Sequence, residues 1–224
     1  MAMGDTSTIT RMTTDLRAVQ ILAAWFSPAF PVGAYSYSHG LEWAVEAGDV
    51  TDTSGLAAWV SDLLRFGAGR TDAILLRHAC AAADPAPIAE LAEALAPSAE
   101  RRLETVAQGT AFARTVAAVW KIPLAPAPLP VAVGAAARRL DLPIEITVTL
   151  YLQAFAANIV SAGVRLIPLG QTDGQRVTAG LMPLVAEIAA ESRGLTLDEV
   201  GGCALGADLA AMLHETQYTR LYRT

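Results

Sequence analysis

Cysteine, lysine and charge of either sign are all scarce in this chain of 224 residues. The two cysteines, Cys80 and Cys203, stand far apart without a CxxC motif or clustered histidines, which argues against a disulfide framework and a zinc knuckle. Lys121 is the sole lysine beside fifteen arginines, and the formal net charge is −6. Because no stripe of basic residues with interleaved aromatics occurs, we expect no nucleic-acid partner.

The N-terminus also lacks the pattern of a signal peptide, since residues 1–15 are polar without a basic start or an apolar stretch, and this predicts a cytoplasmic protein. One charge-free run, Ile146 to Val164, approaches the roughly 20 residues of a membrane-spanning helix. Polar side chains that would need partners in lipid interrupt it: Thr147, Thr149, Gln153, Asn158 and Ser161. We therefore expect no membrane contact and interpret the run as the central buried helix of a bundle.

Hydrophobic residues, by contrast, are abundant at 53% and recur at helical spacing, while no stretch alternates as a strand would. This composition predicts one all-α domain over residues 1–224, a bundle of about eight to ten helices. Residues 1–14 are expected to be disordered, and Asp15 can cap a first helix. The inward face of this helix is predicted to hold Val19, Leu22 and Phe26.

Caps and prolines place the helices that follow. Ser36 or Ser38 can cap a short helix that ends near Gly48, and Ser54 opens a longer one. The inward residues of that longer helix are predicted to be Leu56, Trp59, Val60, Leu63 and Leu64. Further helices are expected over 72–83, over 88–95 and from Pro97 to Trp120. Four prolines between Ile122 and Pro130 predict a stiff extended connection.

The last third of the chain predicts three helices. Pro143 starts the long apolar helix, which ends near Arg165, and residues 174–190 form the next. Thr196 and Glu199 have the spacing of a capping box and open a last helix that runs almost to the C-terminus. Gly201 and Gly202 would then lie inside that helix.

No catalytic constellation emerges from these residues. His214-Glu215 begins like an HExxH zinc motif, but Tyr218 occupies the place of the second histidine. His39, His78 and His214 are the only histidines, so a helical metal-dependent hydrolase is a weak hypothesis. Ser36 and Ser38 beside His39 lack a GxSxG elbow, and helix capping explains them more simply.

Three segments are unusual for a purely structural protein. Ser27 to Glu42 is aromatic and hydroxyl-rich, with no charge before Glu42, so it must pack against its own domain or a partner. Arg165, followed by Gln171 and Gln175, is either a helix termination or a recognition rim, and both readings stay open. The tail, residues 214–224, is dense in tyrosine and arginine and is interpreted as a docking tail.

At these three segments the chain resembles the urease accessory protein F family. The resemblance rests on SPAFPVGAYSYSHGLE at residues 27–42, SAGVRLIPLGQTDGQ at 161–175 and HETQYTRLYRT at 214–224. It implies an all-α, homodimeric, cytoplasmic chaperone for nickel insertion into urease, with no cofactor of its own. The implied partners are the accessory protein called D or H, the GTPase called G, and apo-urease.

The resemblance also implies a set of partner-binding residues, with the tail docking the D/H protein. They are Tyr35, Ser38, His39, Glu42, Arg165, Gln171, Gln175, Glu215, Gln217, Tyr218, Arg220, Tyr222 and Arg223. Phe30, Pro31 and Gly33 are interpreted as shaping the fold. Whether the first segment faces a partner or is buried in a dimer stays open.

Two further hypotheses compete with the scaffold. One is a regulator that supplies an arginine in trans to the partner GTPase, from Arg165, Arg220 or Arg223. The other is the metal-dependent hydrolase, which rests on His39 and His214. A weak nickel contact at either histidine also stays open.

Overall fold

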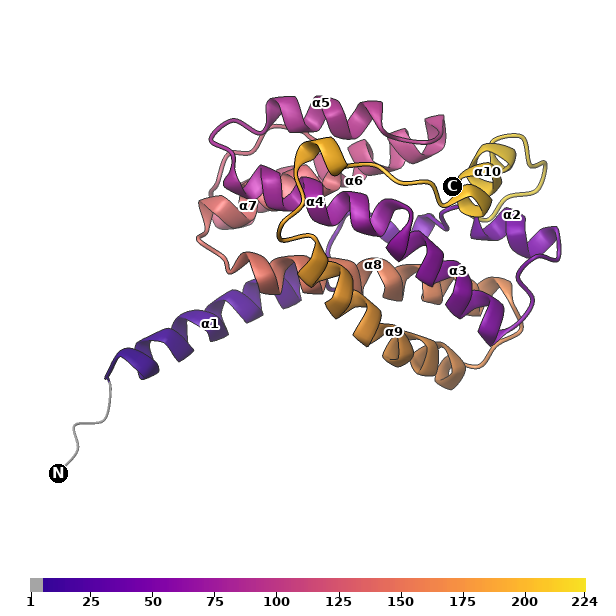
Figure 1. Ribbon diagram of the computed structural model, residues 1–224, viewed down its shortest axis with the longest axis horizontal. Helices are drawn as coiled ribbons and strands as arrows, with labels where there is room; N and C mark the ends of the chain where they lie inside the picture. The colour runs from indigo at the N-terminus through magenta and orange to yellow at the C-terminus, as the bar shows by residue number, and fades with distance from the viewer. Residues whose placement is uncertain (1–5) are drawn as a thin grey trace.

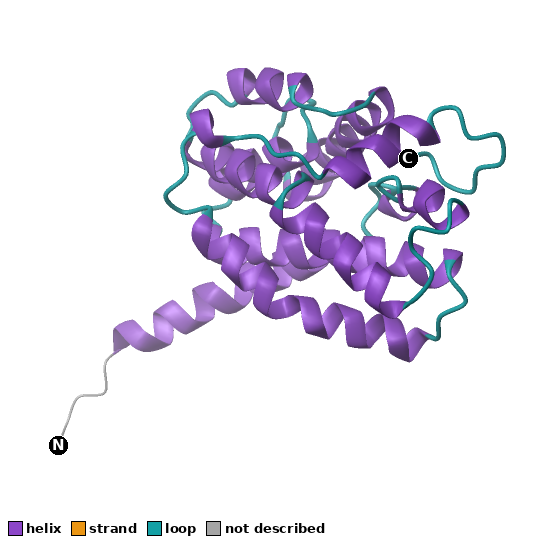
Figure 2. Cartoon of the chain, turned by 45° about the vertical axis from the view of Figure 1, so that its right-hand side comes forward, coloured by secondary structure: helices purple, strands orange, loops and turns teal. Residues whose placement is uncertain are grey.

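The chain folds into an all-α bundle, as the composition predicts. A computed structural model describes the backbone of residues 6–224 and the side chains of residues 16–224, and contains no strand within that part (Figure 2). Its α-helices are α1 (Thr6–Trp25), α2 (Leu41–Glu46), α3 (Thr53–Arg65), α4 (Ala68–Ala81), α5 (Ala86–Ala94), α6 (Ala99–Trp120), α7 (Leu129–Arg139), α8 (Ile144–Leu166), α9 (Gln171–Glu191) and α10 (Leu205–His214). Two 3-10 turns, η1 (Ala34–Ser36) and η2 (Leu197–Glu199), complete the order (Figure 1).

Helix α8 is the central helix of the bundle. It packs against α1, α2, α3, α4 and α9. By length and composition it could cross a membrane, yet half of its most apolar window is buried inside the protein. Gly163 lets α3 approach closely, because a Cβ there would lie 2.5 Å from Leu56 Cδ1. The prediction of a central buried helix is therefore confirmed.

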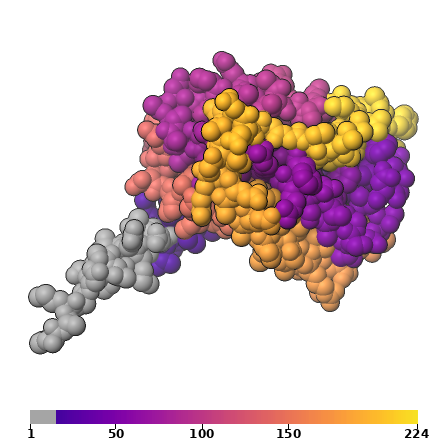
Figure 3. Space-filling model, in the orientation of Figure 1, coloured from indigo at the N-terminus to yellow at the C-terminus, as the bar shows by residue number. Residues whose placement is uncertain are grey.

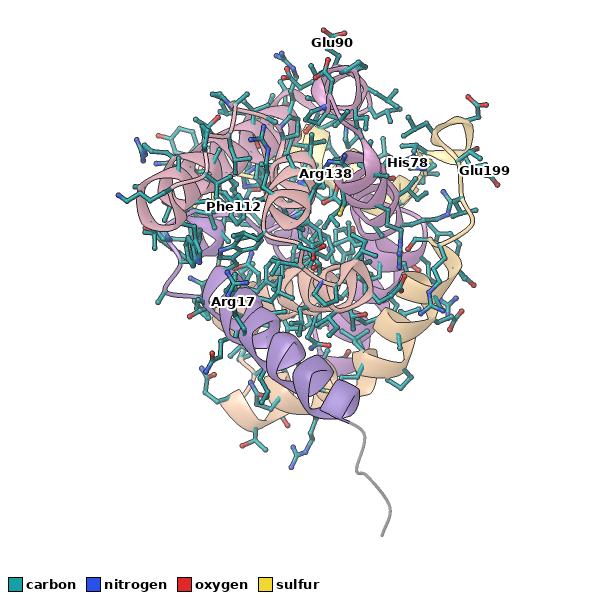
Figure 4. All side chains as sticks on the ribbon, turned by 90° about the vertical axis from the view of Figure 1, so that its left-hand side faces the viewer. Arg17, His78, Glu90, Phe112, Arg138 and Glu199 are labelled. Carbon is teal, nitrogen blue, oxygen red and sulfur yellow. The ribbon has the colours of Figure 1, made fainter. Side chains whose placement is uncertain are left out.

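An aromatic cluster fixes α1 and the first unusual segment to the core. The Trp25 ring meets the Phe112 ring of α6 edge-on, with 5.1 Å between the centroids. The Phe30 ring also packs against Phe112, with 5.5 Å between the centroids. Figure 4 shows Phe112 inside the bundle, whereas Arg17 and Glu90 point outward. Most of the first segment is thus packed against its own domain.

Helix α7 is the element that the sequence analysis missed. Its first turn holds Pro130, a position where proline is tolerated, so the helix begins inside the proline-rich run. Only residues 121–128 form the extended connection. Helix α7 lies between α4 and α6, and a Cβ on Gly134 would lie 2.4 Å from the Leu76 carbonyl oxygen.

Two predicted helix starts differ from the structure. Helix α1 begins at Thr6 and not at Asp15, so residues 6–14 are helical, while residues 1–5 lie outside the described part. Its buried face contains Leu22 but leaves Val19 exposed. The cap of α3 is Asp52 and not Ser54, because Asp52 Oδ1 accepts from the Gly55 amide at 2.8 Å.

The predicted last helix is wrong in its extent. The Thr196–Glu199 capping box exists, since Glu199 Oε2 accepts from the Thr196 amide at 2.8 Å, but it closes only the single turn η2. Gly201 then adopts φ +119°, and a Cβ on Gly202 would lie 2.1 Å from the Phe66 carbonyl oxygen. The chain therefore leaves the helical path, and α10 covers only Leu205–His214.

Candidate partner-docking surface

The tail (residues 214–224) folds back onto the first segment. In Figures 1 and 3 the yellow end of the chain lies beside α2. The Ser38 amide donates to the Thr224 carbonyl at 2.8 Å, and the Arg223 amide donates to the Ser36 carbonyl at 2.8 Å. The Ser38 hydroxyl also donates to the Thr224 carbonyl. The tail is therefore an ordered part of the fold and not a frayed helix end.

The turn before α2 is built for this contact. His39 and Gly40 both have left-handed backbones, with φ 56° and 75°. A Cβ on Gly40 would lie 2.7 Å from the Ala211 amide nitrogen, so glycine lets α10 pack directly on this turn. Gly40 is the N-cap residue in place of the predicted Ser36 or Ser38, although the Ser38 hydroxyl accepts from the Glu42 amide at 3.3 Å.

A buried polar cluster joins α2, α6, α10 and the tail. Glu42 Oε1 accepts from the Leu221 amide at 2.6 Å, and Glu42 Oε2 accepts from the Tyr222 amide at 2.9 Å. The His214 ring lies between two carboxylates, with Nε2 3.0 Å from Glu42 Oε2 and Nδ1 2.8 Å from Glu100 Oε2. These contacts make Glu42 the main anchor of the tail.

The cluster extends to the surface through α6. Arg220 donates to Glu100 Oε1 at 2.6 Å. Glu215 Oε1 accepts from the Ala99 amide at 2.9 Å, so a tail carboxylate sits at the N-terminus of α6, where negative charge is favoured. Gln217 donates to Glu46 of α2. Several of the predicted partner-binding residues thus hold the chain's own tail.

A second buried cluster lies beneath the tail. Thr224 Oγ1 donates to Glu104 Oε2 at 2.9 Å, and His39 Nε2 lies 3.1 Å from Glu104 Oε1. Burial alone would raise the pKa of Glu104, but Arg101 and His39 outweigh it and hold that pKa at about 2. Burial, reinforced by Arg101, lowers the pKa of His39. Glu104 is therefore ionised and His39 neutral at pH 7.

A cavity of about 290 Å³ opens beside this second cluster. Its walls are mainly aromatic, from Trp25, Phe30, Phe112 and Phe155, and its polar lining includes Asp72 and Glu104. At its rim Arg165 donates to the Tyr35 carbonyl at 3.2 Å and lies over the Tyr222 ring, 5.1 Å from the centroid. Arg165 therefore links the second unusual segment to the first and the third.

The outer face of this region is apolar. Helix α10 exposes Leu205, Leu209 and Met212, which are spaced at four and three residues and so share one face. In the tail, Tyr218 is fully exposed and Leu221 is 78% exposed, whereas Tyr222 is buried. We call the set Leu205, Leu209, Met212, Tyr218 and Leu221 the outer face.

The structure brings most of the predicted residues together but not all. Ser38, His39, Glu42, Arg165 and the tail meet around α2, and Tyr35 is 68% exposed at the cavity rim. Gln171 and Gln175 lie apart from the tail cluster, exposed in the first turns of α9.

Sequence reasoning missed the α6 residues Glu100, Arg101 and Glu104. The sequence does contain a signal for them. Positions 100, 101, 104 and 108 are polar and recur at helical spacing, so they form a polar stripe along one side of the helix. Leu103, an apolar residue between them, is 66% exposed. Within residues 16–224, no group of three or more His, Cys, Asp or Glu side chains is arranged to hold a metal ion.

The described residues thus form a helical bundle whose C-terminal tail is folded onto α2 and whose α10 and tail expose apolar side chains. The family model UreF matches residues 50–182. A urease accessory protein UreF of Cereibacter sphaeroides strain KD131 is 58% identical over 92% of this chain and 99% of its own length. Its namesakes from Xanthobacter autotrophicus and Roseobacter denitrificans are 52% and 48% identical, over 91% and 95% of this chain and 90% and 96% of theirs. The chain belongs to the UreF family of urease accessory proteins.

Proposed function

We propose that this chain is a non-enzymatic urease maturation factor in the cytoplasm. With the accessory protein D/H it recruits the GTPase G and promotes insertion of nickel into apo-urease, acting as a homodimer. Membership of the UreF family and the accessory role in the relatives' names support this proposal. The observation that carries this proposal is the outer face. It is apolar and belongs to α10 and to a tail whose backbone amides are held by hydrogen bonds to Glu42.

The outer face has the properties of a protein-docking surface. Exposed aromatic and aliphatic side chains that cluster on one face, rimmed by charge, are typical of interaction sites. Arg220 and Glu215 supply polar groups beside Tyr218, although both also contact the chain's own α6. Because Tyr218 and Leu221 contribute little to the buried core, their exposure is better explained by a partner than by folding. We assign the D/H protein to this face.

Alanine variants of the two exposed tail residues test the assignment. Tyr218→Ala and Leu221→Ala are expected to weaken binding of the D/H protein by about tenfold or more each, the loss usual for an interface hot spot. Calorimetry with the purified partner measures the affinity. Met182→Ala is the matched control, since Met182 is also a large exposed apolar side chain but lies on α9. Unchanged affinity in both tail variants would remove the outer face from the interface.

A GTPase-regulator role is the second candidate, and one arginine favours it. Arg165 contacts Tyr35 and Tyr222, and Arg220 pairs with Glu100. Arg223 is exposed, and among the described residues its side chain has no hydrogen-bond partner. An arginine supplied in trans must be free to reach the phosphates. Arg223→Ala should then slow GTP hydrolysis in the reconstituted complex at least tenfold, whereas unchanged turnover rejects this role.

A further inference from the structure

The main anchor of the tail is the buried carboxylate of Glu42. Glu42 is 5% exposed, and its two oxygens accept from three donors, the Leu221 amide, the Tyr222 amide and His214 Nε2. Leu221 and Tyr222 lie in a bend of the tail, which lets two consecutive amides turn toward one acceptor group. With both amides held by Glu42, the Tyr222 side chain is buried and the Leu221 side chain is exposed.

The His214 ring bridges this carboxylate to a second one. Its ring is fully buried, and both nitrogens face carboxylate oxygens, which accept and cannot donate when ionised. The ring therefore joins α10 to both α2 and α6. Glu100, the second carboxylate, is also paired with Arg220. Glu100 thus connects His214 and Arg220 of the tail to the first turn of α6.

We propose that Glu42 and His214 are positioning residues that hold the tail in the conformation that presents Tyr218 and Leu221. Helix α10 enters the cluster through His214, and the tail enters it through residues 221 and 222, so the cluster closes the loop 215–220 at both ends. The part of the outer face formed by Tyr218 and Leu221 then depends on this clamp being closed. The inference rests on the proposed docking function, because it names what positions the docking residues.

The variant Glu42→Gln tests the clamp directly. An amide group replaces one acceptor oxygen by an NH₂ donor, which then faces a tail amide or the His214 ring. Loss of one charge-assisted hydrogen bond corresponds to about a tenfold to hundredfold change in the opening equilibrium. Amide hydrogen exchange at Leu221 and Tyr222 should accelerate by that factor, and affinity for the D/H protein should fall at least tenfold.

Glu46→Gln is the matched control on the same helix. Glu46 is exposed and accepts only from the Gln217 side chain, so this variant should leave exchange at Leu221 and Tyr222 unchanged. Exchange of α4 amides and the helical circular dichroism signal report whether the bundle itself is intact. If Glu42→Gln does not fold, His214→Gln serves instead, because a glutamine cannot donate from both ends to two carboxylates.

The outcomes separate the clamp from the docking function. Unchanged exchange at Leu221 and Tyr222 in folded Glu42→Gln or His214→Gln overturns the clamp. If Tyr218→Ala weakens partner binding while Glu42→Gln does not, the positioning role is wrong and the proposed function stands. If neither variant weakens binding, the proposed docking function fails and the positioning role fails with it. Faster exchange together with weaker binding supports the proposal.

Discussion

Asp72 is a carboxyl group that is harder to ionise in the folded protein than in the unfolded chain. It lines the aromatic cavity and accepts from the Tyr151 hydroxyl at 2.6 Å. Burial raises its pKa from 3.8 to about 6, outweighing the opposite effects of Tyr151 and Arg101. Since the folded pKa lies above the unfolded value, Asp72 costs no stability below pH 3.8 and an increasing amount as pH rises through 6.

We therefore expect Asp72→Asn to raise the free energy of unfolding more at pH 8 than at pH 4. The amide keeps an acceptor for Tyr151 and has no charge to bury, so the gain is on the order of 2 kcal/mol. Urea unfolding of both proteins at the two pH values measures it.

Glu104→Gln is the contrasting variant for this experiment. The folded pKa of Glu104, about 2, lies below its ordinary 4.5, so its contribution is present above pH 4.5 and is lost as pH falls towards 2. The substitution should destabilise the protein at neutral pH. An Asp72→Asn effect that did not depend on pH would contradict the assignment of a buried, titrating carboxyl.

At the scale of elements, prolines and capping residues predict where a helix starts better than where it ends. Pro143 was correctly placed before α8, because a proline there is compatible with the first turn. The Thr196–Glu199 box was also real, but a cap does not fix how far a helix runs. The helical path ends after η2 because Gly202 packs closely against Phe66, and these two residues are far apart in the sequence. Local patterns do not contain such contacts.

The close contact between α4 and α7 depends on Gly134 having no Cβ atom. Alanine at Gly134 would place its Cβ 2.4 Å from the Leu76 carbonyl oxygen and 3.0 Å from the Cys80 amide. We expect Gly134→Ala to destabilise the protein by about 2 kcal/mol, because backbone atoms cannot move aside as a flexible side chain can. Thermal and urea unfolding measure the change.

Gly180→Ala provides the control for that prediction. Gly180 lies within α9, and its added Cβ would meet nothing within 4 Å. Alanine there should stabilise the helix by about 0.5–1 kcal/mol. Equal effects of the two substitutions would mean that close packing of α4 on α7 does not limit stability.

At the scale of the whole molecule, the sequence predicted which segments matter but not how they meet. The all-α class, the buried α8 and the three unusual segments were all recognisable from residue patterns. Their convergence was not, because Glu42 and Tyr222 are joined by contacts that no periodicity encodes. The same lack explains why Glu42, predicted to face a partner, is instead buried against the chain's own tail.

Removing the last four residues should therefore weaken the whole bundle. A chain ending at Arg220 loses buried Tyr222 and Thr224, the two amides that donate to Glu42, and the hydroxyl that donates to Glu104. We expect a fall in thermal midpoint of several degrees, corresponding to roughly 2 kcal/mol or more. Calorimetry with Tyr218→Ala as control tests this, since that side chain is exposed and its loss should leave the midpoint unchanged.

The position of Glu42 also has a consequence for synthesis on the ribosome. Helix α2 emerges early, whereas the donors that satisfy Glu42 and the carbonyl that accepts from Ser38 lie in residues 214–224. Contacts of such long sequence separation form late. Until the tail has been made, the nascent chain carries α2 with an uncompensated carboxylate and an unfinished turn, so this corner of the protein matures last and is the part most exposed to chaperones or proteases.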